Sequence, residues 1–107
     1  MNNIKSTFSI KNLETFSGIK AHTLRIWEKR YNLLEPERTE TNIRRYSLDN
    51  LRKLLNITLL YNHGFKISKI SSLSLEEISG SVSNIALKEN SEQIAINALK
   101  LAMINFD

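Results

Sequence analysis

Residues 19–31 constrain the fold more than any other part of this chain, because they carry an apolar face and a polar face at helical spacing. Three apolar side chains define the first face: Leu24, Trp27 and Tyr31. Three polar or cationic side chains at the same spacing define the second: His22, Arg25 and Lys29. The DNA major groove is wide enough to admit one helix of this kind. We interpret residues 20–31 as a recognition helix.

A shorter helix is predicted directly before it, over residues 9–16. Ser9 is a favourable N-cap residue, and Leu13 and Phe16 fall on a common face. Gly18 can take a positive φ at no steric cost, which suits a tight turn, and Ile19 can fill the space between two steeply crossed helices. The two helices and their three-residue turn predict a helix-turn-helix.

The segment that follows, residues 32–46, loses the helical period. Pro36 ends helix growth, and Thr41-Asn42 can form a turn. Ile43 and Tyr46 are expected to pin this arm to the core. These features predict a β-hairpin wing over residues 36–46, without an Asn-Gly or Asp-Gly pair to mark its turn.

A longer helix is predicted from the N-cap Ser47 to the stop signal His63-Gly64, with Asp49 near the positive end of its dipole. Its expected core stripe consists of leucines: Leu48, Leu51, Leu55 and Leu59, with Leu54 beside them. A short fourth helix is predicted over residues 65–72. Two of its side chains should face inward and two outward: Ile67 and Ile70, then Lys66 and Lys69.

The remainder begins with a capping-box pattern at Ser74-Leu75-Glu76-Glu77, which predicts one or two helical turns ending at Gly80. Small and polar residues then indicate a turn or linker, which we place at 81–90. A last helix is predicted from Ser91 to about Phe106. It is apolar nearly all round: Ile94, Ile96, Leu99, Leu101, Met103, Ile104 and Phe106.

A helix that is apolar on every side must bury against another chain or against helices that follow it. We therefore expect a DNA-binding domain (1–80), a linker (81–90) and the start of a helical dimerisation or effector region (91–107). We expect the chain to be the N-terminal part of a longer regulator. The alternative is a complete short protein whose last helix pairs with its twin.

Charge is distributed unevenly along the 107 residues. Residues 1–73 hold 13 Lys and Arg against 6 Asp and Glu, whereas residues 74–107 hold 2 against 5. A basic domain that carries a recognition helix points to a polyanionic partner. There is no cysteine, and His22 and His63 fall in different predicted elements, so no zinc-ligand cluster is expected. No apolar run is long enough to span a bilayer, and we expect a cytoplasmic protein.

From about Phe8 to Leu73 the chain resembles the MerR-type winged helix-turn-helix transcription regulators. The resemblance rests on five motifs: Phe8-Ser9-Ile10, Ser17-Gly18-Ile19, His22-Thr23-Leu24-Arg25-Ile26-Trp27-Glu28, Asn42-Ile43-Arg44-Arg45-Tyr46-Ser47 and Gly64-Phe65. Trp27-Glu28 followed by Arg30-Tyr31 is most similar to the subgroup of light- and cobalamin-responsive regulators of carotenoid genes. Lys20 departs from the family, which often has a serine cap there, and Asn32 stands where glycine is common.

The resemblance implies a mainly α fold: a winged helix-turn-helix with a small β-hairpin wing, plus a C-terminal helix. It implies a bacterial homodimer that binds an inverted repeat in double-stranded DNA, with RNA polymerase as a further partner. It implies no cofactor in these residues, and a cobalamin-binding or related domain only in a missing C-terminal part. Two half-sites about 34 to 36 Å apart are also what specific affinity normally requires of so small a module.

The residues expected to contact DNA lie on the recognition helix, on the wing and at the fourth helix: His22, Thr23, Arg25, Lys29, Arg30, Arg38, Asn42, Arg44, Arg45, Tyr46 and Lys66. Arg25 is the first choice for reading guanine, with a phosphate contact as its alternative. Lys29 and Arg30 are expected to neutralise phosphates. One wing arginine should pair with the carboxylate of Glu28, and we predict Arg45.

Two other classes of function are compatible with a winged fold. A protein-interaction adaptor should carry apolar or acidic side chains where His22, Arg25 and Lys29 stand, and this chain does not. An excisionase-like accessory recombination protein would bend DNA beside an integrase. An enzyme is disfavoured, because no nucleophile and base pair, phosphate-binding glycine loop or metal cluster is recognisable.

Overall fold

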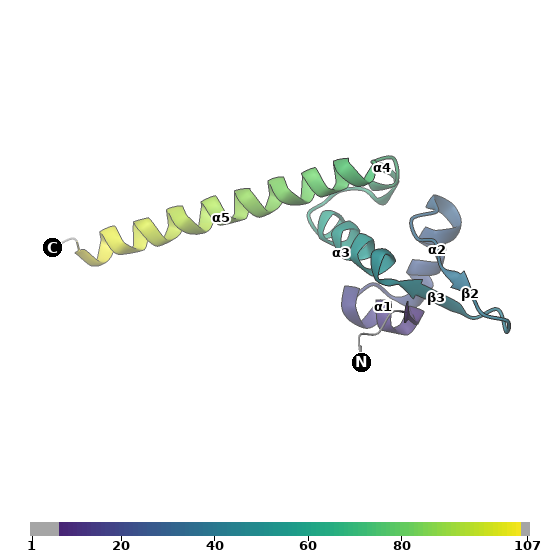
Figure 1. Cartoon of the computed structure of the whole chain (residues 1–107). Coiled ribbons are helices and arrows are strands. Elements are labelled where there is room, and N and C mark those ends of the chain that lie inside the picture. The colour runs from purple at the N-terminus through teal and green to yellow at the C-terminus, as the bar shows by residue number, and fades with distance from the viewer. Residues whose placement is uncertain (1–6, 106–107) are drawn as a thin grey trace, which may run out of the picture.

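The computed structural model describes residues 7–105. In chain order its elements are β1 (Thr7–Phe8), α1 (Ile10–Ser17), α2 (Ala21–Tyr31), β2 (Glu37–Arg38), β3 (Arg44–Ser47), α3 (Leu48–Asn62), α4 (Ile67–Ser71) and α5 (Leu75–Asn105). Figure 1 shows a folded N-terminal part from which α5 projects as a long rod. The rod explains the elongated dimensions of 71 × 39 × 24 Å, because 31 helical residues extend about 46 Å.

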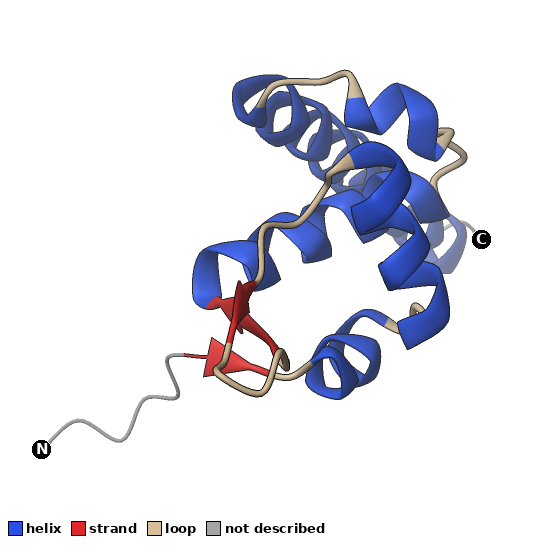
Figure 2. Ribbon diagram, turned by 90° about the vertical axis from the view of Figure 1, so that its right-hand side faces the viewer, coloured by secondary structure: helices blue, strands red, loops and turns tan. Residues whose placement is uncertain are grey.

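One hydrophobic core joins every helix of the N-terminal part. The side chains that are completely buried come from α1, α2, β3, α3 and α4: Leu13, Leu24, Tyr46, Leu54, Ile57, Leu60 and Ile70. Ile78 brings the first turns of α5 into the same core. α3 contacts α1, α4 and α5. Figure 2 shows the small sheet at one corner of the folded part, beside the helices.

The sheet has the strand order β1-β3-β2, with both neighbours antiparallel to β3. The hairpin of β2 and β3 is the predicted wing. β1 was not predicted, and it pairs Phe8 with Tyr46. The wing turn lies one residue earlier than expected, since the Asn42 N–H donates to the Thr39 carbonyl at 2.8 Å. Asn42 follows the turn with a φ of 62°, a conformation that asparagine tolerates.

The local signals that bound the helices are confirmed. Ser9 and Ser47 cap α1 and α3, and Gly18 ends α1 with a φ of 76°. α3 ends before His63 and Gly64, as expected. The Ser74 capping box is also present, because the Glu77 N–H donates to the Ser74 hydroxyl and the Ser74 N–H donates to the Glu77 carboxylate.

Two expectations about packing were wrong. Ile43 does not pin the wing to the core but is exposed. Phe16, on the face predicted for Leu13, is also exposed, and its ring lies edge to face with that of Phe8. Leu48 and Leu55 are exposed as well, so α3 is rotated relative to the predicted stripe. Its buried residues are Leu51, Leu54, Ile57, Thr58 and Leu60. Two stripes fit a leucine-rich helix equally well, and Thr58 can join the core because its hydroxyl donates to the Leu54 carbonyl.

The turn or linker expected at 81–90 does not exist, because α5 is one continuous helix of 31 residues. Glycine, serine and asparagine are poor helix formers, but contacts with the rest of the fold override such preferences. Ile78, Val82 and Ile85 lie at helical spacing and pack against the core. From residue 86 to residue 103 every side chain is exposed. The domain division itself stays a prediction, without an interruption to mark it.

No helix within residues 7–105 combines the length and the apolar character needed to cross a lipid bilayer.

Candidate nucleic-acid interface

The first turn of α2 is capped by its neighbouring helix. Lys20 occupies the N-cap position but makes no side-chain hydrogen bond there. The Glu14 carboxylate of α1 accepts a hydrogen bond from the Ala21 N–H at 3.2 Å instead. A carboxylate at this end satisfies an unpaired amide and complements the helix dipole. Glu14 therefore caps α2 in place of the N-cap side chain and fixes α2 against α1.

The two faces of α2 are as predicted. Leu24 and Trp27 are buried, and the rings of Trp27 and Tyr61 pack edge to face at a centroid distance of 5.1 Å. On the opposite side four polar or cationic side chains are exposed, together with one apolar side chain: His22, Arg25, Lys29 and Arg30, with Ile26 among them. Thr23 is half-buried between the two faces. The core thus holds the aromatic back of α2 and leaves its polar front open to solvent.

The C-terminal end of α2 is held by a ring contact and a left-handed cap. The Arg30 guanidinium lies 5.5 Å from the centroid of the Tyr31 ring, a cation–π arrangement. The helix then ends at Asn32, which has a φ of 52° and donates its N–H to the Glu28 carbonyl. Asparagine is one of the few residues that tolerate this left-handed conformation, so it can end the helix here without a glycine.

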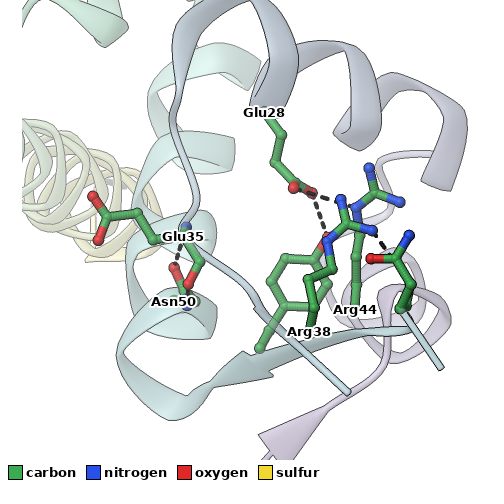
Figure 3. A network of polar contacts seen from close by, with 7 residues as sticks. Glu28, Glu35, Arg38, Arg44 and Asn50 are labelled. Atoms are coloured by element: carbon green, nitrogen blue, oxygen red, sulfur yellow. Dashed lines mark hydrogen bonds and ion pairs between the residues drawn. The ribbon is translucent and has the colours of Figure 1, made fainter. Parts of the chain in front are cut away.

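The connection from α2 to the wing is tied to α3 by Asn50. Its side-chain amide accepts from the Glu35 N–H and donates to the Glu35 carbonyl, both at 3.0 Å. Figure 3 shows this pair beside the wing. Asn50 was not predicted, because its position in the first turn of a helix gives no signal of a contact made across 15 residues of chain.

The wing turn is held by its own polar groups. The Thr39 hydroxyl lies 3.0 Å from that of Thr41 and accepts from the Ile43 N–H. Arg38 donates to the Asn42 carbonyl at 3.3 Å. These bonds define the shape of the exposed tip and place Arg38 and Asn42 at its base and its end.

Glu28 of α2 is paired with Arg44, and the prediction of Arg45 was wrong. Arg44 Nε donates to Glu28 Oε1 at 3.3 Å, and the Tyr46 hydroxyl donates to Glu28 Oε2. Arg45 donates to the Thr7 hydroxyl at 2.9 Å instead. Successive residues of a strand point to opposite faces, so Arg44 and Tyr46 reach α2 while Arg45 faces away.

The predicted DNA contact of Tyr46 does not fit the structure either, because its side chain has no exposed surface. Burial, and then the hydrogen bond to Glu28, raise the pKa of the Tyr46 hydroxyl above its usual range. The hydroxyl is therefore protonated at neutral pH and donates to the carboxylate. Tyr46 joins the wing to the core and to α2.

Between α2 and the wing lies a surface hollow of about 400 Å³, which we call the helix–wing hollow. Five side chains line it: Arg25, Glu28, Lys29, Arg38 and Arg44. Four cations from three elements thus surround one carboxylate. Clefts lined by one sign of charge concentrate counter-ions of the opposite sign. Lys66 is exposed at the start of α4 and does not belong to this lining.

The described part of the chain contains no group of three or more His, Cys, Asp or Glu side chains that could hold a metal ion. We assign no cofactor to these residues. A cobalamin-binding domain elsewhere, which the subgroup resemblance implies, stays a prediction.

Two curated relatives are similar in sequence. The HTH-type transcriptional repressor CarH of Myxococcus xanthus is 28% identical over 80 residues, which is 75% of this chain and 27% of CarH. The HTH-type transcriptional regulator MlrA of Escherichia coli K12 is 29% identical over 70 residues, which is 65% of this chain and 29% of MlrA. The chain therefore spans less than a third of either relative.

Among solved structures the fold is similar to that of HiNmlR, a MerR family regulator lacking the sensor domain, bound to promoter DNA. The TM-score is 0.56 at 23% identity, over 91% of this chain and 78% of HiNmlR. At this identity the likeness shows the fold. The family profile described as "MerR HTH family regulatory protein" matches residues 8–77, well over half of the chain. With its winged helix-turn-helix and its exposed cationic helix face, the chain belongs to the MerR HTH family of regulatory proteins.

Proposed function

We propose that this chain binds double-stranded DNA in a sequence-specific manner and regulates transcription. The observation that carries the proposal is the position of the exposed face of α2 next to the helix–wing hollow and its four cations. A helix in the major groove and a cationic wing on the adjacent backbone are the two contacts that this arrangement offers. Both named relatives are regulators of transcription, which supports the same class.

The exposed residues of α2 take different roles in the proposal. Arg25 reads a guanine edge through two hydrogen bonds, and His22 contacts a base edge near the start of the helix. Lys29 and Arg30 neutralise phosphates, and Thr23 contacts a phosphate or a thymine methyl group.

In the wing, Arg38, Asn42 and Arg44 contact the sugar-phosphate backbone of the DNA. Arg45 is a further candidate for a phosphate contact, because it is partly exposed and is bonded to Thr7 through Nη2. Tyr46 is left out of the contact set, because its side chain is buried. Lys66 contacts phosphate outside the helix–wing hollow.

The DNA-binding form is proposed to be a homodimer on an inverted repeat. Leu87, Ile94 and Leu101 recur at every seventh position of α5 and are all exposed, which matches one of the two apolar positions of a coiled-coil heptad. A second copy of the chain is the occupant that pairs two recognition helices with two half-sites. RNA polymerase is the further partner of such a regulator, and the cytoplasm is its compartment.

The test is recovery of bound duplexes from a random pool, followed by titration of the selected duplex against a scrambled one. If about six phosphates are neutralised per dimer, the logarithm of affinity falls with the logarithm of salt concentration at a slope of about −5. Equal affinity for the two duplexes, or affinity that ignores salt, contradicts the proposal. A protein-interaction adaptor gives no gel shift at physiological salt. An excisionase-like protein also binds DNA, but it differs in that it bends the DNA beside an integrase.

One arginine variant and one lysine variant distinguish the reading of bases from the neutralisation of phosphates. Arg25→Ala is expected to relax the base preference at one position of each half-site, at a cost of about 1 to 3 kcal/mol on the selected duplex. Lys66→Ala is expected to weaken the selected and scrambled duplexes alike. A base preference that survives Arg25→Ala unchanged assigns this residue to phosphate contact.

A further inference from the structure

Glu28 is the acidic member of the helix–wing hollow, and both of its oxygens are used to hold the wing. Oε1 accepts from Arg44 Nε at 3.3 Å, and Oε2 accepts from the Tyr46 hydroxyl. The side chain is only 10% exposed. Figure 3 shows Glu28 reaching from α2 toward Arg38 and Arg44. A single carboxylate thus joins the recognition helix to a strand 16 to 18 residues further along the chain.

A carboxylate in this place has an electrostatic cost for a DNA-binding surface, because it repels the phosphates that the surrounding cations attract. The core already fixes both elements that Glu28 connects: Trp27 anchors α2, and the Tyr46 ring anchors β3. The group that Glu28 additionally orders is the Arg44 side chain. A long arginine side chain loses considerable rotamer freedom when it becomes ordered, so ordering it before binding reduces that loss.

Glu28 holds Arg44 through Nε, the guanidinium nitrogen nearest the chain. Within residues 7–105 the two terminal nitrogens of Arg44 have no hydrogen-bond partner, and the side chain is 26% exposed beside the hollow. A guanidinium held in this way keeps its two terminal donors, which match the geometry of a phosphate. Arg25 and Lys29, on the other side of the hollow, belong to α2.

We propose that Glu28 is a positioning residue for DNA recognition. It holds Arg44 at a fixed place relative to α2. The wing can then contact its phosphate in the same position on the DNA in which α2 contacts its bases. A correctly seated complex gains from this preorganisation, whereas a loosely seated complex on arbitrary DNA does not. The inference rests on the proposed function and adds to it the residue that couples helix and wing.

The test compares Glu28→Gln with Glu40→Gln, which removes an equal charge from an exposed side chain of the wing turn. Binding to the selected and scrambled duplexes is measured by fluorescence anisotropy at fixed salt. Glu28→Gln is expected to weaken the selected duplex about tenfold while leaving the scrambled duplex unchanged or bound more tightly. Glu40→Gln is expected to tighten both by the same small factor. If Glu28→Gln also tightens both equally, Glu28 is only a repulsive charge and the proposal is overturned.

Two further variants keep the test decisive if Glu28→Gln unfolds the protein, which Trp27 fluorescence reports. Arg44→Gln should lower the ratio of selected to scrambled affinity, and Tyr46→Phe, which removes one of the two bonds, should lower it less. Where Glu28→Gln is folded, the double variant Glu28→Gln/Arg44→Gln completes the cycle, and its loss should not exceed that of Arg44→Gln alone. Additive losses overturn the proposal. A wild-type protein that shows no preference for the selected duplex refutes the proposed function itself, which is a separate outcome.

Discussion

The N-terminal unit (residues 7–85) and the α5 tail (residues 86–103) are both mainly helical, but their side chains have opposite environments. In the unit, leucines from several elements meet in one core, and Leu54 has no exposed surface. In the tail, Leu99 is 63% exposed although it also lies on a helix. A helix in water is marginal without contacts to its apolar face. The N-terminal unit is therefore specified by contacts within one chain, whereas the tail requires contacts from outside it.

The largest expected difference between the regions is in the cost of removing a leucine. Leu54→Ala should lower the free energy of unfolding by about 2 to 5 kcal/mol, because it leaves a cavity in a closed core. Leu99→Ala should change the unfolding of the N-terminal unit by less than about 0.5 kcal/mol. Denaturant unfolding followed by the fluorescence of Trp27, the single tryptophan, measures the unit alone. Equal losses for the two variants contradict the division.

The second effect concerns the tail as an interface between two copies. Ile94→Lys places a charge on the apolar seam, so we expect a dimer to become a monomer and the affinity for the selected duplex to fall at least tenfold. Asn90→Lys adds the same charge to the same helix at a polar position and should leave the dimer intact. Light scattering of both variants decides. A wild-type monomer at working concentration removes the basis of this prediction.

A smaller effect is expected at the caps that set the helix boundaries of the unit. Ser9→Ala removes the acceptor of the Asn12 N–H and should cost about 1 kcal/mol of stability. Glu14→Gln keeps an acceptor for the Ala21 N–H but loses the charge at the start of α2, and should cost a few tenths of a kcal/mol. Denaturant midpoints are the measurement. A larger loss for Glu14→Gln than for Ser9→Ala would show that its charge does more than cap α2.

The sequence predicted those parts of the fold that depend on neighbouring residues. The caps Ser9, Ser47 and Ser74 and the positive φ of Gly18 follow from rules that act within four residues, and all were confirmed. The errors arose where distant segments meet. β1 pairs with β3 across nearly forty residues, and the choice between two stripes on α3 is made by the helices around it.

The candidate site shows the same distinction. The exposed face of α2 could be predicted from its period, because the face is a property of one helix. The partner of Glu28 could not, because the choice between Arg44 and Arg45 depends on the register of β3 relative to α2. The continuity of α5 was likewise decided by Val82 and Ile85 packing on the core and not by local composition.

The smallest predicted effect tests the junction between the two regions. His63 Nδ1 lies 2.8 Å from the Leu59 carbonyl, and Nε2 lies 2.6 Å from Glu89 of α5. The Glu89 carboxylate, and then the Leu59 carbonyl, hold the pKa of His63 above its usual value. His63 and Glu89 line a surface hollow at this junction together with Lys88 and Glu92. Only the protonated ring can donate to both oxygens.

The sign of the pH dependence follows from that raised pKa. The stabilisation is fully present below the unfolded pKa of about 6.5, and it is lost as the pH rises through the higher folded-state value. The stability of the wild type relative to His63→Gln should therefore decline over that window. Glu89→Gln should lower the pKa of His63 in an NMR titration. A His63 pKa at or below its usual value contradicts the contact.

In the proposed complex the N-terminal unit reads a half-site, and the α5 tail joins two units on one DNA. The decisive experiment is selection from a random duplex pool with the wild type and with Ile94→Lys. The wild type is predicted to recover an inverted repeat whose half-site centres lie about 34 to 36 Å apart or a multiple of that distance. Ile94→Lys is predicted to recover the same half-site alone, with weaker enrichment. A single asymmetric site for the wild type, or an unchanged inverted repeat for Ile94→Lys, would contradict it.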